Sequence, residues 1–305
     1  MEEKSKILVI SLAVVLMALP FVSAMGAADD SSSGSIFSFG TDAKALAMGG
    51  SYVAVADNYS ATYWNPAGLT QFSGVQLGGM QLRPYGVGNL QHAAGSVTFG
   101  NFAVGASWAS SGVDMSDQLG YQGTTLEDYS DVVFGGTFAY GIDFANFGAS
   151  VKSYQLEAAG SSIGFDMGTL MEFGGVRLGV SASDVGVSLG ENAQMNATYR
   201  LGVAADLMDR ATASAEFDML GNGSQLIKAG FEILPVQQFA LRGGVKVPMG
   251  DEGGGPSFTA GAGVNLAGLT VDIAWLQNST EFSDVGSDTL VLSAGFKFGA
   301  FGESA

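Results

Sequence analysis

Large apolar residues alternate with small or polar residues along most of the chain, with a period of two. In the segment 269–275 (LTVDIAW) the odd-numbered positions hold Leu, Val, Ile and Trp, whereas the even-numbered positions hold Thr, Asp and Ala. The same pattern recurs in 101–108, 199–207 and 290–298. Successive side chains of a β-strand point to opposite faces, so this period predicts strands with one apolar face.

The alternating segments number about fourteen, each roughly 9–12 residues long, which is the length that a tilted strand needs to cross a membrane. Tight turns alternate with longer polar connections, which is typical of outer-membrane barrels. The sequence therefore predicts an all-β fold, an antiparallel transmembrane β-barrel with both chain ends on the short-turn side. The predicted strands start near Val75, Gln91, Asn101, Asp131, Asn146, Ser162, Gly175, Ala197, Arg210, Gln225, Gln238, Ser257, Leu269 and Asp288.

A soluble β-sandwich or β-helix would also show alternation. The number and length of the strands argue against it, and so does an export signal at the N-terminus. Lys4 and Lys6 precede an apolar run at 7–19, and small residues suit cleavage after Ala24. We therefore expect a signal peptide at 1–24, export through the Sec pathway and a Gram-negative-type outer-membrane location. An uncleaved anchor is the alternative, because the run approaches bilayer length.

The amino-acid composition argues against several classes of function. Of the 305 residues 47% are hydrophobic and 13% are charged, and the net charge of −17 argues against nucleic acid as a partner. The chain has no Cys and one His, so neither disulfides nor a zinc site are expected. We expect no cofactor, no metal and no enzymatic activity, because no catalytic or metal-ligating constellation is present. Acidic residues in the long connections are interpreted as solvated charge rather than a calcium site, and His92 is assigned no role.

The second face of the strands collects charges of both signs. Charges on a lipid-facing surface would cost about 2–4 kcal/mol each near the midplane, so this face is expected to line the lumen. Two interpretations stay open: a selectivity surface for a solute, or cross-strand ion pairs that hold the barrel and an inner plug. The predicted lumen charges are Lys152, Arg177, Arg200, Glu216, Asp218, Lys228, Glu232, Arg242, Lys246 and Asp272.

The stretch 60–69 (SATYWNPAGL) precedes the strands and carries a different signal. Pro66 excludes Asn65 from the helical region and fixes a bend. Asn65 can bond backbone groups at that bend, and Ala67 and Gly68 allow another segment to pass close. The stretch is therefore expected to act as a lock or a gate, and the sequence leaves both open.

Upstream of this bend the sequence predicts two short elements. Asp42 can cap a helix over 43–48, and Gly49 can end that helix in the left-handed conformation. The segment 52–56 (YVAVA) is expected to form a short strand-like piece.

The stretches 41–57 (TDAKALAMGGSYVAVAD) and 60–69 resemble the N-terminal signature of the PorV/PorQ-like proteins, within the wider family of FadL-type long-chain fatty-acid transporters. The segments 199–203 (YRLGV), 241–245 (LRGGV) and 269–273 (LTVDI) resemble strand repeats of that group. The resemblance implies a fourteen-stranded barrel at 74–305 and a hatch at 25–73 folded into its lumen.

The resemblance also implies a function. It predicts passive uptake of hydrophobic, fatty-acid-like small molecules through a hatch-gated lumen, in contact with membrane lipid. A PorV-like barrel that shuttles or holds exported proteins at the cell surface is the alternative, whereas a general porin fits the charged lumen but not the hatch. An apolar pocket is expected beside Tyr52, Tyr63, Trp64 and Phe72. The full set of ligand and hatch candidates is Tyr52, Tyr63, Trp64, Asn65, Pro66, Ala67, Gly68 and Phe72.

Overall fold

The computed structural model describes residues 36–84, 88–113, 129–157, 160–188, 195–208, 210–250, 255–277 and 288–299. The predicted signal peptide, the first part of the predicted hatch and the loop segments 114–128, 251–254 and 278–287 lie outside the described residues. No helix in the described part of the chain is long and apolar enough to cross a membrane.

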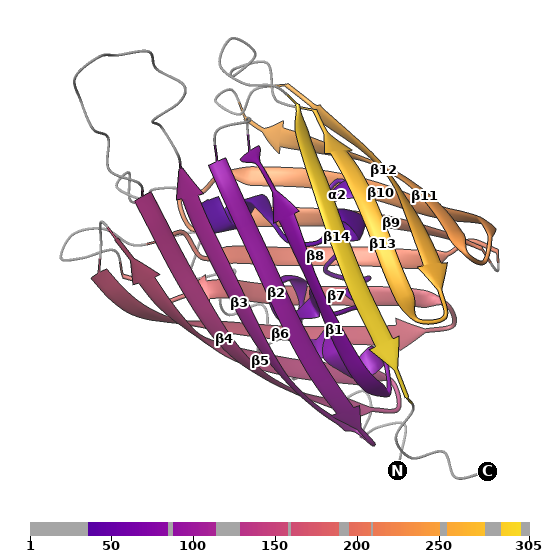
Figure 1. Ribbon diagram of the computed structural model, residues 1–305. Helices are drawn as coiled ribbons and strands as arrows, with labels where there is room; N and C mark the ends of the chain where they lie inside the picture. The colour runs from indigo at the N-terminus through magenta and orange to yellow at the C-terminus, as the bar shows by residue number, and fades with distance from the viewer. Residues whose placement is uncertain are drawn as a thin grey trace.

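Fourteen antiparallel strands form a closed barrel (Figure 1). Each strand pairs with its neighbours in sequence, and β1 closes the ring by pairing with β14, where Val75 lies opposite Phe298. The predicted all-β barrel is confirmed. The strands are β1 (Gly74–Leu82), β2 (Gly88–Phe99), β3 (Phe102–Val113), β4 (Tyr129–Ile142), β5 (Ala145–Leu156), β6 (Gly160–Phe173), β7 (Val176–Val185), β8 (Thr198–Asp206), β9 (Ala211–Leu220), β10 (Gln225–Val236), β11 (Phe239–Met249), β12 (Ser257–Leu266), β13 (Leu269–Leu276) and β14 (Thr289–Phe298).

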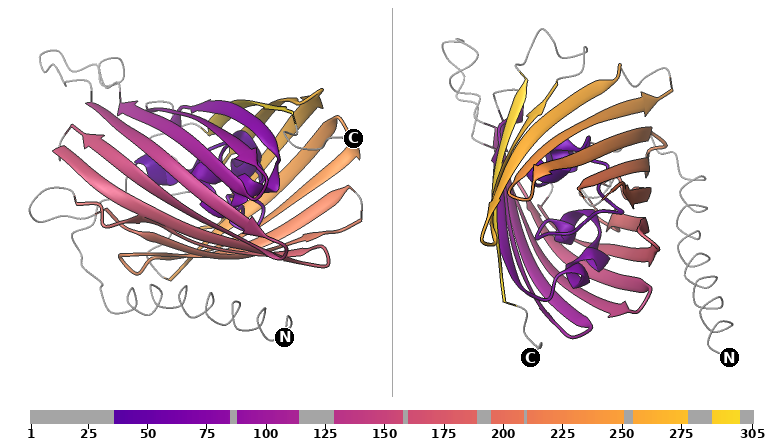
Figure 2. Two further views of the ribbon diagram at one scale, coloured as in Figure 1. Left: turned by 90° about the horizontal axis from the view of Figure 1, so that it is seen from below. Right: turned by 90° about the vertical axis from the view of Figure 1, so that its right-hand side faces the viewer.

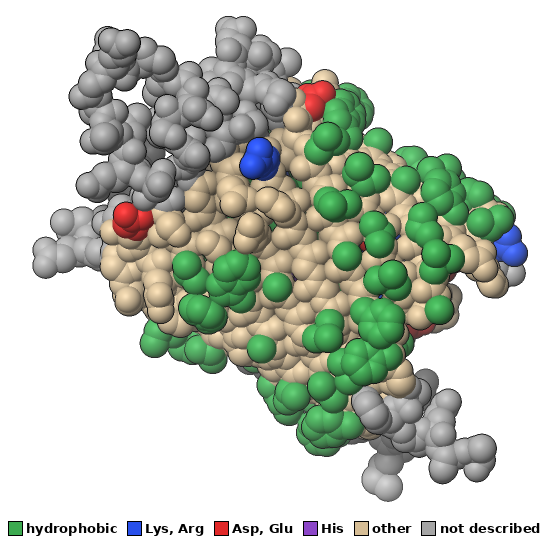
Figure 3. Space-filling model, in the orientation of Figure 1, with side chains coloured by type: hydrophobic (Ala, Val, Ile, Leu, Met, Phe, Trp, Pro, Cys, Tyr) green, Lys and Arg blue, Asp and Glu red, His purple; other side chains and the backbone are tan. Residues whose placement is uncertain are grey.

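The outward face of the barrel is apolar, as the alternation predicts. Ile163 and Leu292 are each 57% exposed, and large apolar side chains are exposed on neighbouring strands all round the ring. Figure 3 shows such side chains spread over the wall, with charged side chains at its margins. An apolar surface of this extent on a closed sheet indicates contact with lipid.

Aromatic side chains gather on the outside at the short-turn end. The ring centroid of Phe102 lies 6.5 Å from that of Phe99 and 4.8 Å from that of Tyr140. On the closing strand the rings of Phe296 and Phe298 lie 5.3 Å apart. Aromatic girdles mark the membrane–water interface of barrels, so this end of the strands marks one membrane boundary.

Placing a charge on the lipid face should reveal the depth of each position in the membrane. Leu292→Lys, near the middle of β14, is expected to lower the free energy of unfolding in lipid vesicles by about 2–4 kcal/mol. Leu269→Lys, at the short-turn end of the neighbouring β13, is the matched control and should cost about 0–1 kcal/mol. Denaturant titration in vesicles measures both, and equal losses at the two sites would contradict the membrane placement.

The described residues 36–73 lie inside the barrel, and we call this segment the hatch. Its elements are η1 (Ile36–Phe39), α2 (Ala43–Ala47), α3 (Ala61–Trp64) and η2 (Pro66–Gln71). Figure 2 shows them within the ring of strands. Because α2 packs against β11–β14 and η2 packs against β2–β6, the hatch contacts both sides of the lumen.

Two local predictions for the hatch are confirmed and one is wrong. Asp42 caps α2 by accepting a hydrogen bond from the backbone N of Lys44 at 3.4 Å, and Gly49 adopts a φ of 70°. The segment 52–56 is not strand-like but a helical turn, in which the N–H of Ala56 donates to the carbonyl of Tyr52 at 2.9 Å. All five of its side chains are buried inside the lumen, and the N–H groups of Tyr52 and Val53 donate to the side chain of Glu216 on β9 instead of to a strand backbone.

Candidate functional site

Within the described residues, one cavity lies on each side of the hatch along the barrel axis. The outer cavity lies toward the long-loop end and has a volume of about 40 Å³. The inner cavity lies toward the short-turn end, beside the turn at Gln237 and Gln238, and has a volume of about 280 Å³. The hatch therefore separates a small outer chamber from a larger inner one.

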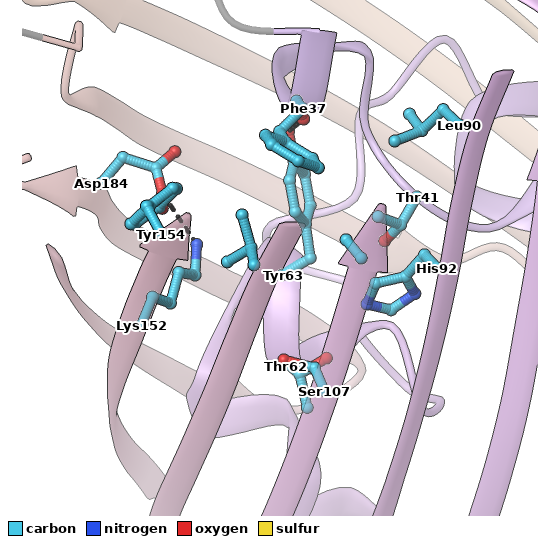
Figure 4. A pocket seen from close by; sticks show the side chains of 12 residues that line it. Phe37, Thr41, Thr62, Tyr63, Leu90, His92, Ser107, Lys152, Tyr154 and Asp184 are labelled. Atoms are coloured by element: carbon cyan, nitrogen blue, oxygen red, sulfur yellow. Dashed lines mark hydrogen bonds and ion pairs between the residues drawn. The ribbon is translucent and has the colours of Figure 1, made fainter. Parts of the chain in front are cut away.

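The outer cavity is lined mostly by apolar groups (Figure 4). The hatch contributes Tyr63, whose hydroxyl donates to the carbonyl of Phe37 at 2.9 Å. A cavity that binds benzene in an engineered protein measures roughly 150 Å³. At about 40 Å³, the outer cavity is too small for a ring until a side chain moves. The residues lining it are Phe37, Thr41, Thr62, Tyr63, Leu90, His92, Ser107, Ala109, Val133, Lys152, Tyr154 and Asp184.

A strand irregularity turns Asp184 into the outer cavity. Asp184 follows Ser183, whose side chain faces the lumen, so a regular strand would point Asp184 outward. The register of β6 and β7 shifts at this point, and Asp184 has a φ of 60°. Its carboxylate accepts hydrogen bonds from Lys152 Nζ at 2.9 Å and from the hydroxyl of Tyr154. Bulges commonly re-aim a side chain in this way.

The one cation in the lining of the outer cavity is fully paired. Lys152 Nζ lies 2.7 Å from Asp166 and 2.9 Å from Asp184. The backbone N–H of Asp184 donates in turn to Asp166 at 2.8 Å. A ligand carboxylate would therefore meet a lysine that already has two carboxylate partners.

The inner cavity is bordered by ion pairs between hatch and wall. Lys44 Nζ lies 2.8 Å from Asp57 of the hatch and 3.5 Å from Glu232 of β10. Burial acts to lower the pKa of Lys44, but the carboxylates of Asp57 and Glu232 outweigh it and hold that pKa above its usual range. Burial acts to raise the pKa of Asp57, but Lys44 and Lys297 outweigh it and hold that pKa below its usual range. Both groups therefore stay charged around neutral pH.

A wall carboxylate anchors the middle of the hatch. Glu216 of β9 accepts the backbone N–H groups of Tyr52 and Val53 at 2.8 and 2.7 Å. Its other oxygen lies 3.2 Å from Lys228 Nζ, which also lies 2.5 Å from Asp218. Hydrogen bonds to a buried charged acceptor are among the stronger ones in proteins, so this contact fixes the turn at 52–56 to the wall.

Wall cations also cover the two aromatic rings of α3. Arg200 lies 5.5 Å from the centroid of the Tyr63 ring and 5.6 Å from that of the Trp64 ring. Lys152 approaches the Tyr63 ring at 5.6 Å, and Lys228 approaches the Trp64 ring at 5.5 Å. Cation–π contacts of this kind contribute about 0.5–2 kcal/mol each, and together they orient α3 in the lumen.

Asn65 joins three segments at the predicted bend. Its backbone is extended, with a φ of −160°, and Pro66 begins η2 directly after it. The side-chain amide donates to the carbonyl of Val53 at 2.9 Å and to that of Thr169 on β6 at 3.0 Å, and its oxygen accepts from the N–H of Ala67 at 3.2 Å. Because Asn65 is completely buried, no water competes for these bonds. The amide thus ties two hatch turns to the barrel wall.

Glycines on the lumen face leave room for the hatch backbone. A Cβ atom at any of them would lie under 3.0 Å from hatch atoms, mostly backbone. Gly230 faces Met48 and Gly179 faces Val53. The wall glycines therefore allow the backbone of the hatch and the backbone of the strands to approach each other closely. The glycines concerned are Gly148, Gly168, Gly179, Gly202, Gly230 and Gly244.

Filling one of these positions should dislodge the hatch without harming the barrel. Gly230→Val is expected to destabilise docking of the hatch by about 2 kcal/mol or more, because its side chain collides with backbone of Met48. Gly136→Val on β4 is the control, since nothing lies within 4 Å of its Cβ position. Amide hydrogen exchange of residues 43–71 should quicken in the first variant only. Unchanged exchange in Gly230→Val would contradict the close packing.

The predicted hatch residues divide into two groups. Tyr63 lines the outer cavity, as expected. Tyr52 and Trp64 are instead buried within the hatch and border neither cavity, and Phe72 lies near the short-turn end under Lys297, at 5.2 Å. Neither of these two cavities lies beside all four residues, because the hatch packs Tyr52 and Trp64 into a core of its own, and the expected pocket stays a prediction. Pro66 and Ala67 are buried with Asn65 against the wall, whereas Gly68 is buried against Ala56 of the hatch itself.

The predicted lumen charges lie inside the barrel and most are paired with one another. Arg242 bridges Glu232 and Asp272, both at 2.6 Å. Arg177 pairs with Asp206 at 2.7 Å near the short-turn end. Lys246 is more exposed and forms no ion pair within the described residues, where it lies opposite Lys228. Cross-strand pairing, one of the two interpretations left open, accounts for nearly all of the set.

Sequence reasoning missed several residues of the site. Lys44 and Asp57 lie in the segment 41–57, but the sequence does not reveal that they pair with each other. Asp184 sits at a position whose parity predicts an outward side chain, and only the bulge turns it inward. His92 is buried and lines the outer cavity. The sequence feature that could have identified it is its place on the inward face of β2.

No protein-family model matches the sequence, and no curated protein matches it. Solved structures do match. The toluene transporter TbuX of Ralstonia pickettii has a TM-score of 0.65 at 15% sequence identity, over 85% of this chain and 99% of that chain. This chain has the same barrel fold. The CymD monoaromatic hydrocarbon channel has a TM-score of 0.64 at 13% identity, over 87% of this chain and 99% of that chain.

A third solved structure with the same fold is the toluene transporter TodX of P. putida. Its TM-score is 0.58 at 13% identity, over 85% of this chain and 99% of that chain. At identities this low the likeness establishes the fold alone. The predicted barrel architecture is therefore confirmed, whereas the narrower PorV/PorQ assignment stays a prediction.

Proposed function

We propose that this protein is an outer-membrane channel for passive entry of neutral hydrophobic small molecules, with the hatch as the gate in its lumen. The observation that carries the proposal is the apolar outer cavity, which rests directly on a hatch held by ion pairs and hydrogen bonds. Three solved barrels of the same fold are hydrocarbon transporters or channels, which supports this class of cargo.

The arrangement of charges favours neutral cargo over fatty acids. A fatty-acid carboxylate needs a free cation or several N–H donors when it leaves water. Lys152, the cation in the lining of the outer cavity, already has Asp166 and Asp184 as partners. We therefore narrow the fatty-acid-like cargo predicted from the sequence to uncharged molecules.

The hatch of this structure represents the closed state of the proposed channel. The outer cavity is too small for a ring, and the hatch contacts opposite sides of the wall. Passage therefore requires the hatch to shift. The contacts that resist such a shift are Asn65 with Thr169, Glu216 with the turn at 52–56, and Lys44 with Glu232.

Uptake by intact cells tests the proposal. Cells that carry the barrel in their outer membrane are given radiolabelled propylbenzene or radiolabelled oleate, beside vector cells. We expect propylbenzene uptake several-fold above vector and oleate uptake close to vector. Uptake of propylbenzene at the vector level, by a barrel shown to be inserted and heat-modifiable, would contradict the proposed function. The predicted secretion-associated role would then be tested by isolating exported proteins bound to the barrel.

A further inference from the structure

Two buried polar groups in the outer cavity have no hydrogen-bond partner within the described residues. They are Nδ1 of His92, on β2, and Oγ1 of Thr41, on the hatch. The residues are 4% and 3% exposed, respectively. Figure 4 shows the two side chains together on one side of the cavity, with Lys152, Tyr154 and Asp184 on the other side.

Such unpaired groups are uncommon, because about nine in ten buried polar groups find a partner. Leaving one unpaired destabilises the folded protein, because the group has given up its hydrogen bonds to water. Other polar groups of the lining are already engaged: the hydroxyl of Thr62 donates to the carbonyl of Tyr59 at 3.1 Å, and that of Tyr63 donates to the carbonyl of Phe37. His92 and Thr41 therefore keep free hydrogen-bonding capacity inside a cavity that is otherwise mostly apolar.

The chemistry of the pair specifies what would satisfy it. A threonine hydroxyl can donate and accept, and a neutral imidazole nitrogen does one or the other, depending on the tautomer. A ligand hydroxyl also donates and accepts, so it complements both groups in either tautomer. A carboxylate does not suit the cavity, because Lys152 is already paired with two carboxylates.

We propose that the outer cavity selects apolar molecules that carry one hydroxyl group, of the alkylphenol or alcohol type, with His92 and Thr41 holding the hydroxyl. This rests on the proposed function and names the class of cargo that the channel prefers. The apolar part of the ligand would lie against Leu90, Ala109 and Val133. Because the cavity is small, the ligand takes the place of the Phe37 side chain, which caps it from η1.

A matched pair of ligands and one matched substitution test the proposal. The barrel in lipid nanodiscs is titrated with 4-propylphenol and with propylbenzene, and the ratio of the two dissociation constants is measured. Comparing this ratio between variants cancels the different cost of removing the two ligands from water, because that cost is the same for every variant. His92→Phe keeps the ring stacked on Tyr59, 6.1 Å away in the natural protein, and removes the polar nitrogen. We expect this substitution to shift the ratio about tenfold against the phenol, as for the loss of one hydrogen bond, with propylbenzene affinity within twofold.

Two further variants make the test specific. Thr41→Val, which keeps the shape of the side chain, should shift the ratio in the same direction. Ser96→Ala is the control: Ser96 is also buried on β2 with an unpaired hydroxyl, but it lies outside the cavity and should leave the ratio unchanged.

The outcomes separate this inference from the proposed function. If both ligands bind and His92→Phe and Thr41→Val leave the ratio unchanged, water alone satisfies the two groups and the inference is overturned, while the channel proposal stands. If the natural protein binds neither ligand, both proposals fail. If His92→Phe weakens both ligands equally while the barrel stays folded, His92 has a packing role only and the inference is again overturned.

Discussion

Asn65→Ala should detach the hatch from the wall while the barrel stays intact. The substitution removes three buried hydrogen bonds and leaves the carbonyls of Val53 and Thr169 and the N–H of Ala67 without that partner. Each buried group left unpaired costs about 1–3 kcal/mol, so the three groups together are expected to lower the stability of the docked hatch by roughly 3–9 kcal/mol. This loss corresponds to roughly a 100-fold or greater rise in the open population.

Hydrogen exchange of the hatch amides measures the effect of Asn65→Ala, and heat-modifiability of the barrel checks that the wall is unaffected. Gln71→Ala is the graded control. Its amide also donates to two hatch carbonyls, those of Val55 and Ala56, but Gln71 is half-buried and water can replace it. We expect its effect to be several times smaller. Equal effects of the two substitutions would argue that Asn65 is not the lock.

Glu216→Ala should release the hatch from a second part of the wall, on β9. It leaves the N–H groups of Tyr52 and Val53 unpaired and takes one carboxylate from Lys228. Breaking a buried charge pair of this kind costs about 3–5 kcal/mol. Lys228 keeps Asp218 as a partner, so the expected loss falls mainly on the turn at 52–56 rather than on the pairing of β9 with β10.

The control for Glu216→Ala is another wall carboxylate that does not touch the hatch. Asp206→Ala removes the pair with Arg177 at the barrel margin, where the Asp206 side chain is 50% exposed. Exposed pairs contribute about 0–1 kcal/mol, so hatch exchange should not change. Protease cleavage within residues 43–71 should therefore accelerate in Glu216→Ala and stay slow in Asp206→Ala. Resistance of Glu216→Ala to the protease would show that the turn is held by packing alone.

The barrel was predictable from the sequence because lipid imposes a strict rule on each strand. Every outward side chain must be apolar, so the period of two persists around the whole ring and sets both strand number and facing. The inward orientation of the lumen charges follows from the same alternation, because they occupy the positions between the outward-facing ones. The sequence does not determine which of these charges pair, because pairing depends on the register between strands. In the structure the register places Lys228 opposite Glu216.

The arrangement inside the lumen was less predictable, because the side chains there are buried by both the hatch and the wall. Tyr and Val in 52–56 favour a strand, but every residue of the segment is buried and the chain turns. Asp184 was missed because a bulge reverses its facing. His92 was given no role because a single histidine carries no motif. Its unpaired nitrogen becomes visible only when the cavity around it is known.

The claim that the hatch gates the channel is tested most directly by cross-linking the hatch to the barrel wall. Ser214 of β9 donates to the carbonyl of Ser51 of the hatch at 2.8 Å, so the two residues are neighbours, and the chain contains no Cys that would compete. Ser51→Cys/Ser214→Cys therefore introduces one pair of thiols, whose cross-linking on oxidation is verified first. We predict that propylbenzene uptake falls to the vector level when the pair is oxidised and returns on reduction, whereas each single-Cys variant stays active. Unchanged uptake through a fully cross-linked, inserted barrel would contradict a hatch-gated lumen.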